Sequence, residues 1–509
     1  MGTRLRNAVV LVAALSVLLA IASVGCGSSG PSGGGSVSVS PDGGATSDGG
    51  NGGGTPDASG GGESPDAGSG SGGGVSDAGG GGGVPDAGGS GGGGEPDAGG
   101  GGTDGGSAGG FRINVHLAGQ GGGRVESAPG GISCPGQCSA SFPQGEVKLI
   151  SSANAGSGFA YWAGGCLDSD ASCTINVWHD FEVWATFEPP PPVTYSVRVI
   201  PKANTTYSVN AAGNATGVGY GGAHTSDGDA FLFDAATGQT SFLTFSANEQ
   251  SHAQGINDRN AIVANVMPNR TGNNSSRAVR WENGVTTELG TLGGNTWGYG
   301  INASNQVVGW YVHPNGRGGT FTRAFLHDGQ RMIDLGSLDG TCSEAHAIDR
   351  TGTAVGSSCS GATRHAVVFH QGGAIEDLTP STYGVADGIS DAGFIVGRAG
   401  PGGFIRAPDG SMRDVGSLPS GSGSWLHGVN DAGVAVGFGL VPAYAPKGYL
   451  TNTWRAAVWL GGRLWDLSYL TGRSDTSLSE AFGINGSGQI VARGYVPNSD
   501  GWSVLLTPR

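Results

Sequence analysis

A nine-residue pattern recurs seven times in this 509-residue chain, and it constrains the fold more than any other feature. The first polar residues of successive copies are spaced by 47, 45, 47, 41, 40 and 55 residues. A repeat of this length is typical of a chain built from one small supersecondary unit per copy. The copies are VNAAGNATG (209–217), INDRNAIVA (256–264), INASNQVVG (301–309), IDRTGTAVG (348–356), ISDAGFIVG (389–397), VNDAGVAVG (429–437) and INGSGQIVA (484–492).

Each copy predicts a β-hairpin. Its second residue is short and polar, and the residue three positions later is always Gly or Asn, which tolerate a left-handed backbone. This pairing is typical of a type I turn followed by a G1 bulge. The pairs are Asn210/Gly213, Asn257/Asn260, Asn302/Asn305, Asp349/Gly352, Ser390/Gly393, Asn430/Gly433 and Asn485/Gly488.

Two further apolar runs follow the hairpin in most copies, such as RAFLH (323–327) and IDLGSL (333–338), or RAAVW (455–459) and WDLSYL (465–470). Four short strands per unit predict the blade of a β-propeller. The seventh copy ends without a fourth strand, whereas YSVRVIP (195–201) precedes the first hairpin without a partner. We therefore expect an all-β, seven-bladed propeller over residues 194–509, in which this first run supplies the missing strand of the last blade and removes the exposed edges. A solenoid would have no use for two ends that complement each other.

The pieces Gly300-Ile301-Asn302, Ala324-Phe325 and Asp334-Leu335-Gly336, with their counterparts, resemble the HAF family of extracellular repeats. Residues 111–188 are similar to the divergent InlB B-repeat (bacterial repeat) family, through Gly123-Arg124-Val125 and Phe159-Ala160-Tyr161-Trp162. The second resemblance implies a small β-grasp-like module on the cell surface, with no catalytic residues. Residues 189–193, which include four prolines, are expected to form a stiff linker.

Residues 1–25 have the charged start and short apolar run of a signal peptide. The run ends at Ser23-Val24-Gly25-Cys26, which resembles a bacterial lipobox, and the resemblance implies a lipid on Cys26; an ordinary cleaved signal is the alternative. Gly27, in place of an aspartate, favours the outer membrane or cell surface as the location of this exported protein, with the lipid as its membrane contact.

Residues 26–110 predict a disordered tether, because 37 of the 80 residues from 31 to 110 are glycine and almost no apolar surface is available to bury. A recognised Pro-Asp-Ala-Gly motif or calcium binding by its aspartates is the functional alternative. These 80 residues hold ten acidic and no basic side chains, so they account for −10 of the net charge of −15. The remainder has no basic stripe, and we expect no nucleic-acid partner.

Six cysteines remain after Cys26, an even number that predicts disulfides in an exported chain. The short gaps favour local pairs, and no histidine stands at zinc-site spacing. Two of the six lie seven residues to either side of the fourth turn, where cross-strand neighbours could bond. The disulfide candidates are Cys134, Cys138, Cys166, Cys173, Cys342 and Cys359.

No catalytic motif, metal-site spacing or cofactor signature is present, so we predict no catalytic residue, metal or cofactor. The residues three and five positions before each turn share a face of a regular strand and vary between copies. They are candidates for a ligand rim, and interblade packing is the alternative. The candidates are Trp297, Tyr299, Glu344, His346, Trp425, His427 and Glu480.

These patterns predict a monomeric cell-surface lipoprotein that binds or adheres to a glycan or protein without catalysis. The alternatives are a polysaccharide-active enzyme, whose acidic residues would converge from several blades, and a purely structural envelope protein.

Overall fold

A computed structural model of the chain describes residues 110–509, except 222–227, 246–248, 269–274, 315–317 and 500. The predicted signal peptide, the lipidation site Cys26 and the tether lie outside these residues. The described part is an all-β structure with one short helix, and none of its helices is long and apolar enough to cross a membrane.

Residues 195–508 form seven groups of four antiparallel strands, which we call blades 1 to 7. Six of them are separate sheets, and the four strands of blade 6 belong to an eight-stranded sheet shared with residues 111–188. Blade 1 contains β10 (Ala203–Val209), β11 (Ala215–Gly219), β12 (Asp229–Asp234) and β13 (Gln239–Phe242); blade 2 contains β14 (Glu249–Ile256), β15 (Ile262–Pro268), β16 (Arg277–Glu282) and β17 (Val285–Glu288); blade 3 contains β18 (Thr296–Ile301), β19 (Val307–Pro314), β20 (Thr320–His327) and β21 (Met332–Gly336). Blade 4 contains β22 (Ser343–Ile348), β23 (Ala354–Ser360), β24 (Thr363–Phe369) and β25 (Ile375–Asp377); blade 5 contains β26 (Gly384–Ile389), β27 (Ile395–Ala399), β28 (Gly402–Arg406) and β29 (Met412–Asp414). Blade 6 contains β30 (Gly423–Val429), β31 (Ala435–Tyr444), β32 (Leu450–Leu460) and β33 (Arg463–Asp466); blade 7 contains β34 (Ser477–Ile484), β35 (Ile490–Tyr495), β36 (Ser503–Pro508) and β9 (Tyr195–Val199).

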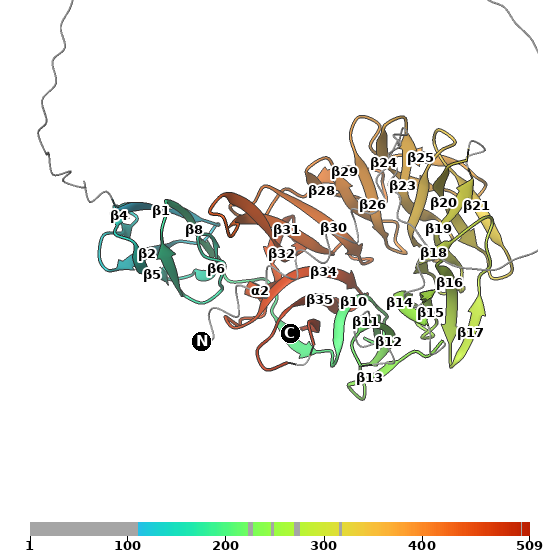
Figure 1. The fold of residues 1–509 in the computed structure, drawn as a ribbon, viewed down its shortest axis with the longest axis horizontal. Helices are drawn as coiled ribbons and strands as arrows, with labels where there is room; N and C mark the ends of the chain where they lie inside the picture. Colours follow the sequence, from blue (N-terminus) through green and yellow to red (C-terminus); the bar gives the residue numbers. More distant parts are fainter. Residues whose placement is uncertain (1–109, 222–227, 246–248, 269–274, 315–317, 500) are drawn as a thin grey trace, which may run out of the picture. The chain divides into compact units, whose positions relative to one another are not determined.

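The blades close into a ring through the strand at the start of this segment. β9 pairs with β36, so that Val199 lies opposite Val504 and residues from both ends of the segment complete blade 7. The first strand of each blade contacts the first strand of the next, and β34 of blade 7 contacts β10 of blade 1 (Figure 1). The predictions of an all-β chain and a β-propeller are confirmed.

All seven repeat copies form the predicted turn. In each, the first polar residue and the residue three positions later are joined by a backbone hydrogen bond, as in Gly433 N–H to Asn430 O at 3.0 Å. The later residue has a positive φ in every copy, from 61° at Asn260 and Asn305 to 93° at Gly352. The side-chain oxygen of the first residue also accepts backbone N–H groups of its own turn; Asn430 Oδ1 accepts from Ala432 and Val434. The repeated residues therefore form and stabilise the turn.

The turn asparagines also connect the blades. Their Nδ2 atoms donate to the backbone carbonyl of the equivalent residue in the next blade, at 2.8–3.2 Å. Asp349 and Ser390 have no such amide, and at those two junctions the aspartates Asp391 and Asp431 accept a backbone N–H from the preceding turn. The donor–acceptor pairs are Asn210–Asn257, Asn257–Asn302, Asn302–Asp349, Asn430–Asn485 and Asn485–Asn210.

Every first strand contains a β-bulge three residues before its turn. In blade 4, Ala345 pairs with Gly356 and Ala347 with Val355, so His346 is the additional residue. The bulge brings the carbonyl of Glu344 against Gly356, where a Cβ would lie 1.9 Å from the oxygen. Five copies end in glycine at this position, so the last residue of the repeat accommodates the bulge.

Residues 111–188 form a module of two four-stranded layers with an apolar core between them, and one layer belongs to the eight-stranded sheet that includes blade 6. The separate layer contains β3 (Ser133–Cys134), β2 (Gly123–Ala128), β5 (Gly145–Ala153) and β7 (Ser172–Val177); the shared layer contains β4 (Ser139–Phe142), β1 (Phe111–Ala118), β8 (Phe181–Glu188) and β6 (Gly158–Gly164). Disulfides join Cys134 to Cys138 and Cys166 to Cys173, as the local gaps predict. The described module contains no helix, so it is a two-sheet structure and differs in this respect from the β-grasp-like fold that we expected.

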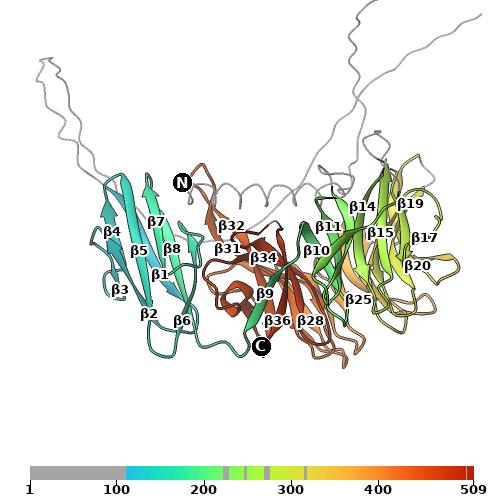
Figure 2. The ribbon, with the colours of Figure 1, turned by 90° about the horizontal axis from the view of Figure 1, so that it is seen from below.

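The module packs directly on blade 6, where β31 and β32 extend beyond the other strands of their sheet (Figure 2). Ala443 of β31 pairs with Gly164 of β6. Tyr161 of β6 is 1% exposed, lies in an apolar cluster with residues of blades 5 and 6, and donates to Pro419 O at 2.7 Å. The prolines of residues 189–193 therefore do not hold two bodies apart as a spacer, because the bodies on either side are in contact.

The same contact includes a buried ion pair. Arg455 Nε contacts Asp466 Oδ2 at 2.5 Å, and both side chains are 5% exposed or less. Arg455 also donates to Ser169 of the module and lies over the ring of Tyr161. Asp466 caps the short helix α2 (Leu467–Leu470), so the run WDLSYL is strand only up to Asp466 and differs from our expectation of a strand throughout.

Candidate functional site

The residues three positions before the turns lie on the bulges and meet around the ring. We call them the inner ring: Tyr207, Gln254, Tyr299, His346, Asp387, His427 and Phe482. Neighbouring members touch from blade 3 through blade 7 to blade 1, as the stacked rings of His427 and Phe482 show at 5.8 Å between centroids. All seven are partly exposed, so the ring is accessible to solvent.

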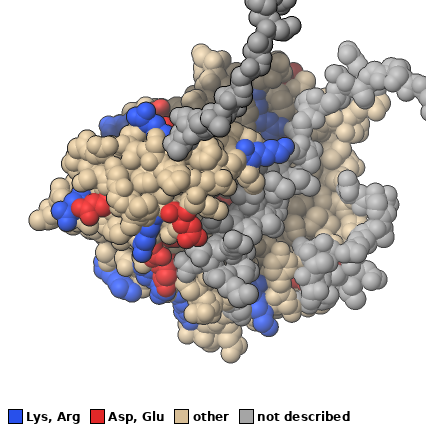
Figure 3. Space-filling view, turned by 60° about the vertical axis from the view of Figure 1, so that its left-hand side comes forward, with Lys and Arg blue, Asp and Glu red and all other residues tan. Residues whose placement is uncertain are grey.

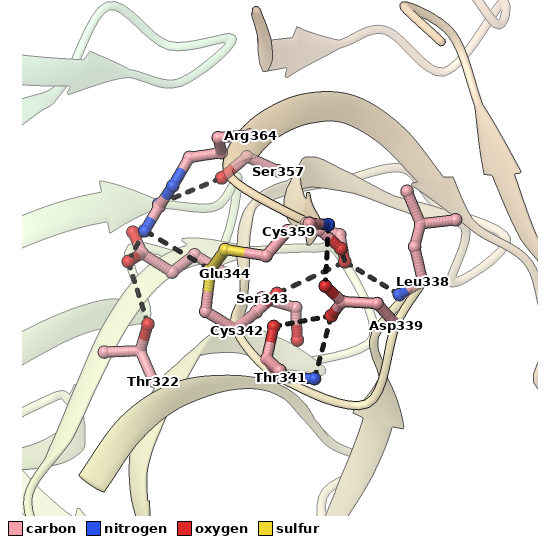
Figure 4. The surroundings of a disulfide bond; sticks show 12 residues. Thr322, Leu338, Asp339, Thr341, Cys342, Ser343, Glu344, Ser357, Cys359 and Arg364 are labelled. Carbon is pink, nitrogen blue, oxygen red and sulfur yellow. Dashed lines mark hydrogen bonds and ion pairs between the residues drawn. A yellow bond between two sulfur atoms is a disulfide. The ribbon is translucent and has the colours of Figure 1, made fainter. Parts of the chain in front are cut away.

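A chain of alternating charges occupies blades 4 and 5 of this ring. Arg364 Nη1 lies 3.0 Å from Glu344 Oε1, and Glu344 Oε2 lies 3.6 Å from His346 Nε2. The other nitrogen of His346, Nδ1, lies 2.9 Å from Asp387 Oδ1. Thr322 of blade 3 donates to the same Glu344 carboxylate at 3.1 Å (Figure 4).

The chain continues through blades 6 and 7. Asp387 Oδ2 accepts the indole N–H of Trp425 and lies 3.9 Å from His427 Nδ1. His427 Nε2 lies 3.0 Å from Glu480 Oε1. Both histidines therefore have a carboxylate near each ring nitrogen, and only a doubly protonated imidazole can donate to both.

The electrostatic environment favours the charged form of each central group. Burial lowers the pKa of His346, but hydrogen bonds to Asp387 and Glu344 outweigh it and raise the pKa to about 9. Burial raises the pKa of Glu344, but the contacts of His346 and Arg364 outweigh it and lower the pKa to about 2. Burial raises the pKa of Asp387, but the hydrogen bond and charge of His346 outweigh it and lower the pKa. Burial lowers the pKa of His427, but the hydrogen bond and charge of Glu480 outweigh it and raise the pKa. At neutral pH this part of the ring is a set of matched ions.

The third disulfide supports one end of the charge chain. Cys342 and Cys359 bond across β22 and β23, directly beside Ser343 and Glu344 (Figure 4). Arg364 Nη2 lies 3.8 Å from Cys342 Sγ, and its Nη1 also donates to Ser357. The disulfide that we predicted from the turn geometry is present, and it lies against the guanidinium that pairs with Glu344.

The structure brings most of the predicted rim residues together. Glu344, His346, Trp425, His427 and Glu480 belong to the charge chain, and the ring of Tyr299 lies 5.1 Å from that of His346. Burial and the nearby Glu344 carboxylate raise the pKa of Tyr299. Trp297 instead stacks on Trp310 of its own blade, with His252 at its edge.

Two important groups are absent from the predicted set. Asp387 links both histidines, and it occupies the same repeat position as His346 and His427, so the repeat register could have identified it. Arg364 lies in β24, the third strand of blade 4, where no sequence signal connects it to Glu344. The two candidate positions share a face as we expected in blades 4 and 6, where Glu344 lies 3.6 Å from His346 and the ring of Trp425 lies 5.7 Å from that of His427.

Among the described residues, no group of three or more His, Cys, Asp and Glu side chains is arranged to hold a metal ion. Away from the ring, positive and negative side chains are scattered among uncharged ones on the face shown in Figure 3. The ring can therefore offer charged hydrogen-bonding groups and aromatic faces to a ligand, held in place by contacts between six blades.

No protein-family model matches the chain, and no curated protein is similar to it in sequence. Among solved structures, the chain is similar to TolB from Acinetobacter baumannii, with 12% identity and a TM-score of 0.32. The match covers 58% of this chain and 63% of TolB, which is less than two thirds of its length. It is similar to the β-propeller domain of the Trilobed protease from Pyrococcus furiosus (8% identity, TM-score 0.36), covering 63% of this chain and 94% of that chain. The acylaminoacyl peptidase of Pyrococcus horikoshii is a third such structure (9% identity, TM-score 0.31), covering 69% of this chain and 54% of that chain. Similarity at this level concerns the fold alone.

Proposed function

We propose that this chain is an exported, lipid-anchored protein of the bacterial cell surface that binds an extracellular ligand without catalysis. Its seven-bladed propeller, of the HAF-repeat type, presents the ligand site, and the module at residues 111–188, of the InlB B-repeat type, supports blade 6. The lipid on Cys26 and the tether would hold this unit at the outer membrane or cell surface.

The inner ring carries this proposal. The seven copies agree at the turn, where the residues make hairpins and join blades, and they differ at the ring, where side chains remain partly exposed. A purely structural ring would be served by small or apolar side chains. This one contains two histidines, the carboxylate of Asp387 and three aromatic side chains, and the carboxylates of Glu344 and Glu480 contact its histidines. Convergent polar groups beside aromatic faces are typical of a ligand site.

One observation favours the enzyme alternative. The carboxylates of Glu344 and Asp387 both contact the imidazole of His346, so two acids lie close together as glycoside hydrolysis requires. That chemistry also needs one carboxyl group with a raised pKa, and the pKa values of Glu344 and Asp387 are lowered. The lowered pKa values therefore favour binding over acid catalysis by these two carboxyls.

A screen of glycans and peptides against the purified mature protein tests the proposal. We expect at least one class to raise the melting temperature, and Phe482→Ala together with Trp425→Ala to abolish the shift. Incubation of the bound glycan with the protein, followed by analysis for shortened products, separates binding from hydrolysis. A folded protein whose melting temperature no compound changes would contradict the proposed function.

A further inference from the structure

One arginine beside the inner ring has no carboxylate partner among the described residues. Arg398, at the end of β27 in blade 5, donates through Nε to Gly400 O at 2.7 Å. Its guanidinium lies 5.2 Å from the ring centroid of Trp425 and 5.8 Å from that of Tyr383. The other guanidinium N–H groups have no acceptor in the described part of the chain.

The surrounding charges do not neutralise this arginine. The three ring carboxylates, Glu344, Asp387 and Glu480, are each matched by a cation: Arg364, His346 and His427. Arg398 is therefore an excess positive charge beside a balanced set of ions. Arg493, which lies opposite Glu480 in the blade 7 sheet, adds a second arginine without a carboxylate within 4.0 Å in the described structure. This local excess contrasts with the net charge of −15 of the whole chain.

Contacts within the protein hold the side chain of Arg398 in place without a ligand. Trp425 is anchored through its indole N–H to Asp387, and the guanidinium lies over its ring. The ring of Tyr383 also lies near the guanidinium, and Tyr383 is 40% exposed, so one of the two neighbouring aromatic rings is open to solvent. An arginine held against aromatic rings loses little side-chain freedom when it binds a planar anion.

We infer that the ligand is an acidic polysaccharide, and that the carboxylate or sulfate of one of its sugars binds Arg398 while the sugar ring lies against Tyr383 and Trp425. The inference rests on the proposed function and specifies the chemistry of its ligand. An anion supplies the counter-ion that Arg398 lacks, and a bidentate contact uses the two terminal nitrogens that are free. Polysaccharide is favoured over acidic peptide because two aromatic rings lie within 6 Å of the charge, and aromatic rings suit the face of a sugar ring.

Calorimetric titration of the mature protein with tetragalacturonate and with its methyl ester tests the inference, because the ester removes the charge and retains the sugar. We expect the acid to bind and the ester to bind at least tenfold more weakly. Arg398→Gln should weaken binding of the acid by tenfold or more, and Arg398→Lys, which retains the charge, should recover part of the loss. Arg259→Gln is the matched control: Arg259 is an exposed arginine on the turn of blade 2, and its loss should change affinity less than twofold. Dextran sulfate and neutral dextran repeat the comparison for sulfate.

The outcomes separate the two proposals. Equal binding of acid and ester, of dextran sulfate and dextran, or of wild type and Arg398→Gln, would overturn the inference and leave the binding function standing. Binding of polyglutamate without any acidic glycan would overturn the ligand class. Absence of binding to acidic glycans, neutral glycans and peptides by the folded protein would overturn both. If Arg398→Gln does not fold, Arg398→Lys and the acid–ester comparison still decide the question.

Discussion

The side-chain amide of Asn485 donates a 2.8 Å hydrogen bond to the backbone carbonyl of Asn210, 275 residues earlier in the chain. It is the same contact that joins other neighbouring blades, and here it joins the last blade to the first. The Oδ1 atom of Asn485 meanwhile accepts from the backbone of its own turn. The side-chain oxygen of Asn485 thus stabilises its own turn, and its side-chain nitrogen connects blade 7 to blade 1.

Asn485→Asp should therefore destabilise the propeller by about 1–3 kcal/mol, because the aspartate keeps the turn acceptor and places an oxygen against the carbonyl of Asn210. Asp349→Asn is the matched reverse change, since Asp349 has the acceptor and lacks the donor. It should be neutral or stabilising. Urea denaturation gives the free energy of unfolding for both, and equal effects of the two variants would contradict a role for the amide.

The charge chain should contribute most to the free energy of unfolding between about pH 4.5 and pH 6.5. His346 has a folded pKa of about 9 against an ordinary value of 6.5, so its contribution is complete below 6.5 and is lost as the pH rises to 9. Glu344 has a folded pKa of about 2 against 4.5, so its contribution is complete above 4.5 and is lost as the pH falls to 2.

The alkaline loss should be on the order of 2–3 kcal/mol for His346. Denaturation at pH 6 and pH 9 measures it, and NMR titration of the imidazole measures the pKa directly. His346→Gln should remove most of the difference between the two pH values. An imidazole that titrates near 6.5 in the folded protein would show that the ion pairs do not form.

Replacement of both Cys342 and Cys359 by serine should lower stability by about 3 kcal/mol, because the bond closes a 17-residue separation in the unfolded chain. The same change at Cys134 and Cys138, which are four residues apart, should cost about 2 kcal/mol. The first pair should also weaken ligand binding, since it supports Arg364 and Glu344, and the second should not. Identical binding by both variants would argue against this support.

Tyr161→Ala should destabilise the propeller, although Tyr161 belongs to the module. The change leaves a cavity in the cluster shared with blades 5 and 6 and should cost about 3–5 kcal/mol. Tyr161→Phe removes only the hydrogen bond to Pro419 and should cost about 1 kcal/mol. Tyr449→Ala, at a residue that is 61% exposed, is the control and should change stability by less than about 0.5 kcal/mol. A propeller that unfolds at the same denaturant concentration with and without Tyr161 would show that the contact does not couple the two bodies.

Cys26→Ala tests the membrane anchor. If the cysteine carries the lipid, the variant should appear in the soluble fraction after cell fractionation, whereas the wild type sediments with membranes. Serine substitution at Cys342 and Cys359 provides the control, because those cysteines form a disulfide and should not affect fractionation. Membrane association of Cys26→Ala would contradict lipidation.

The repeats made much of the propeller predictable. Turn geometry depends on neighbours in sequence, so Asn430 and Gly433 indicated their hairpin without any tertiary information. The period then set the number of sheets, and the unpaired run at 195–201 indicated the strand that completes blade 7. The six cysteines paired as their spacing suggested, because all three bonds are local.

The site was less predictable. Sequence register placed Glu344, His346 and His427 at candidate positions, but it did not show that Asp387 would join the two histidines from a different blade. The bulge at every ring position was also missed, because it depends on the pairing of two strands, in which the carbonyl of one comes close to the glycine that ends most copies.

The sequence by itself thus determined the hairpins, the blades and the disulfides, since each depends on residues close together in the chain. Tertiary structure alone decided that Arg364 would pair with Glu344, that Arg398 would lie over Trp425 without a counter-ion, and that Tyr161 would enter the core of blades 5 and 6. Those contacts join residues on different strands, blades or bodies. They arise only when the strands pair into sheets and the sheets and the module pack against one another.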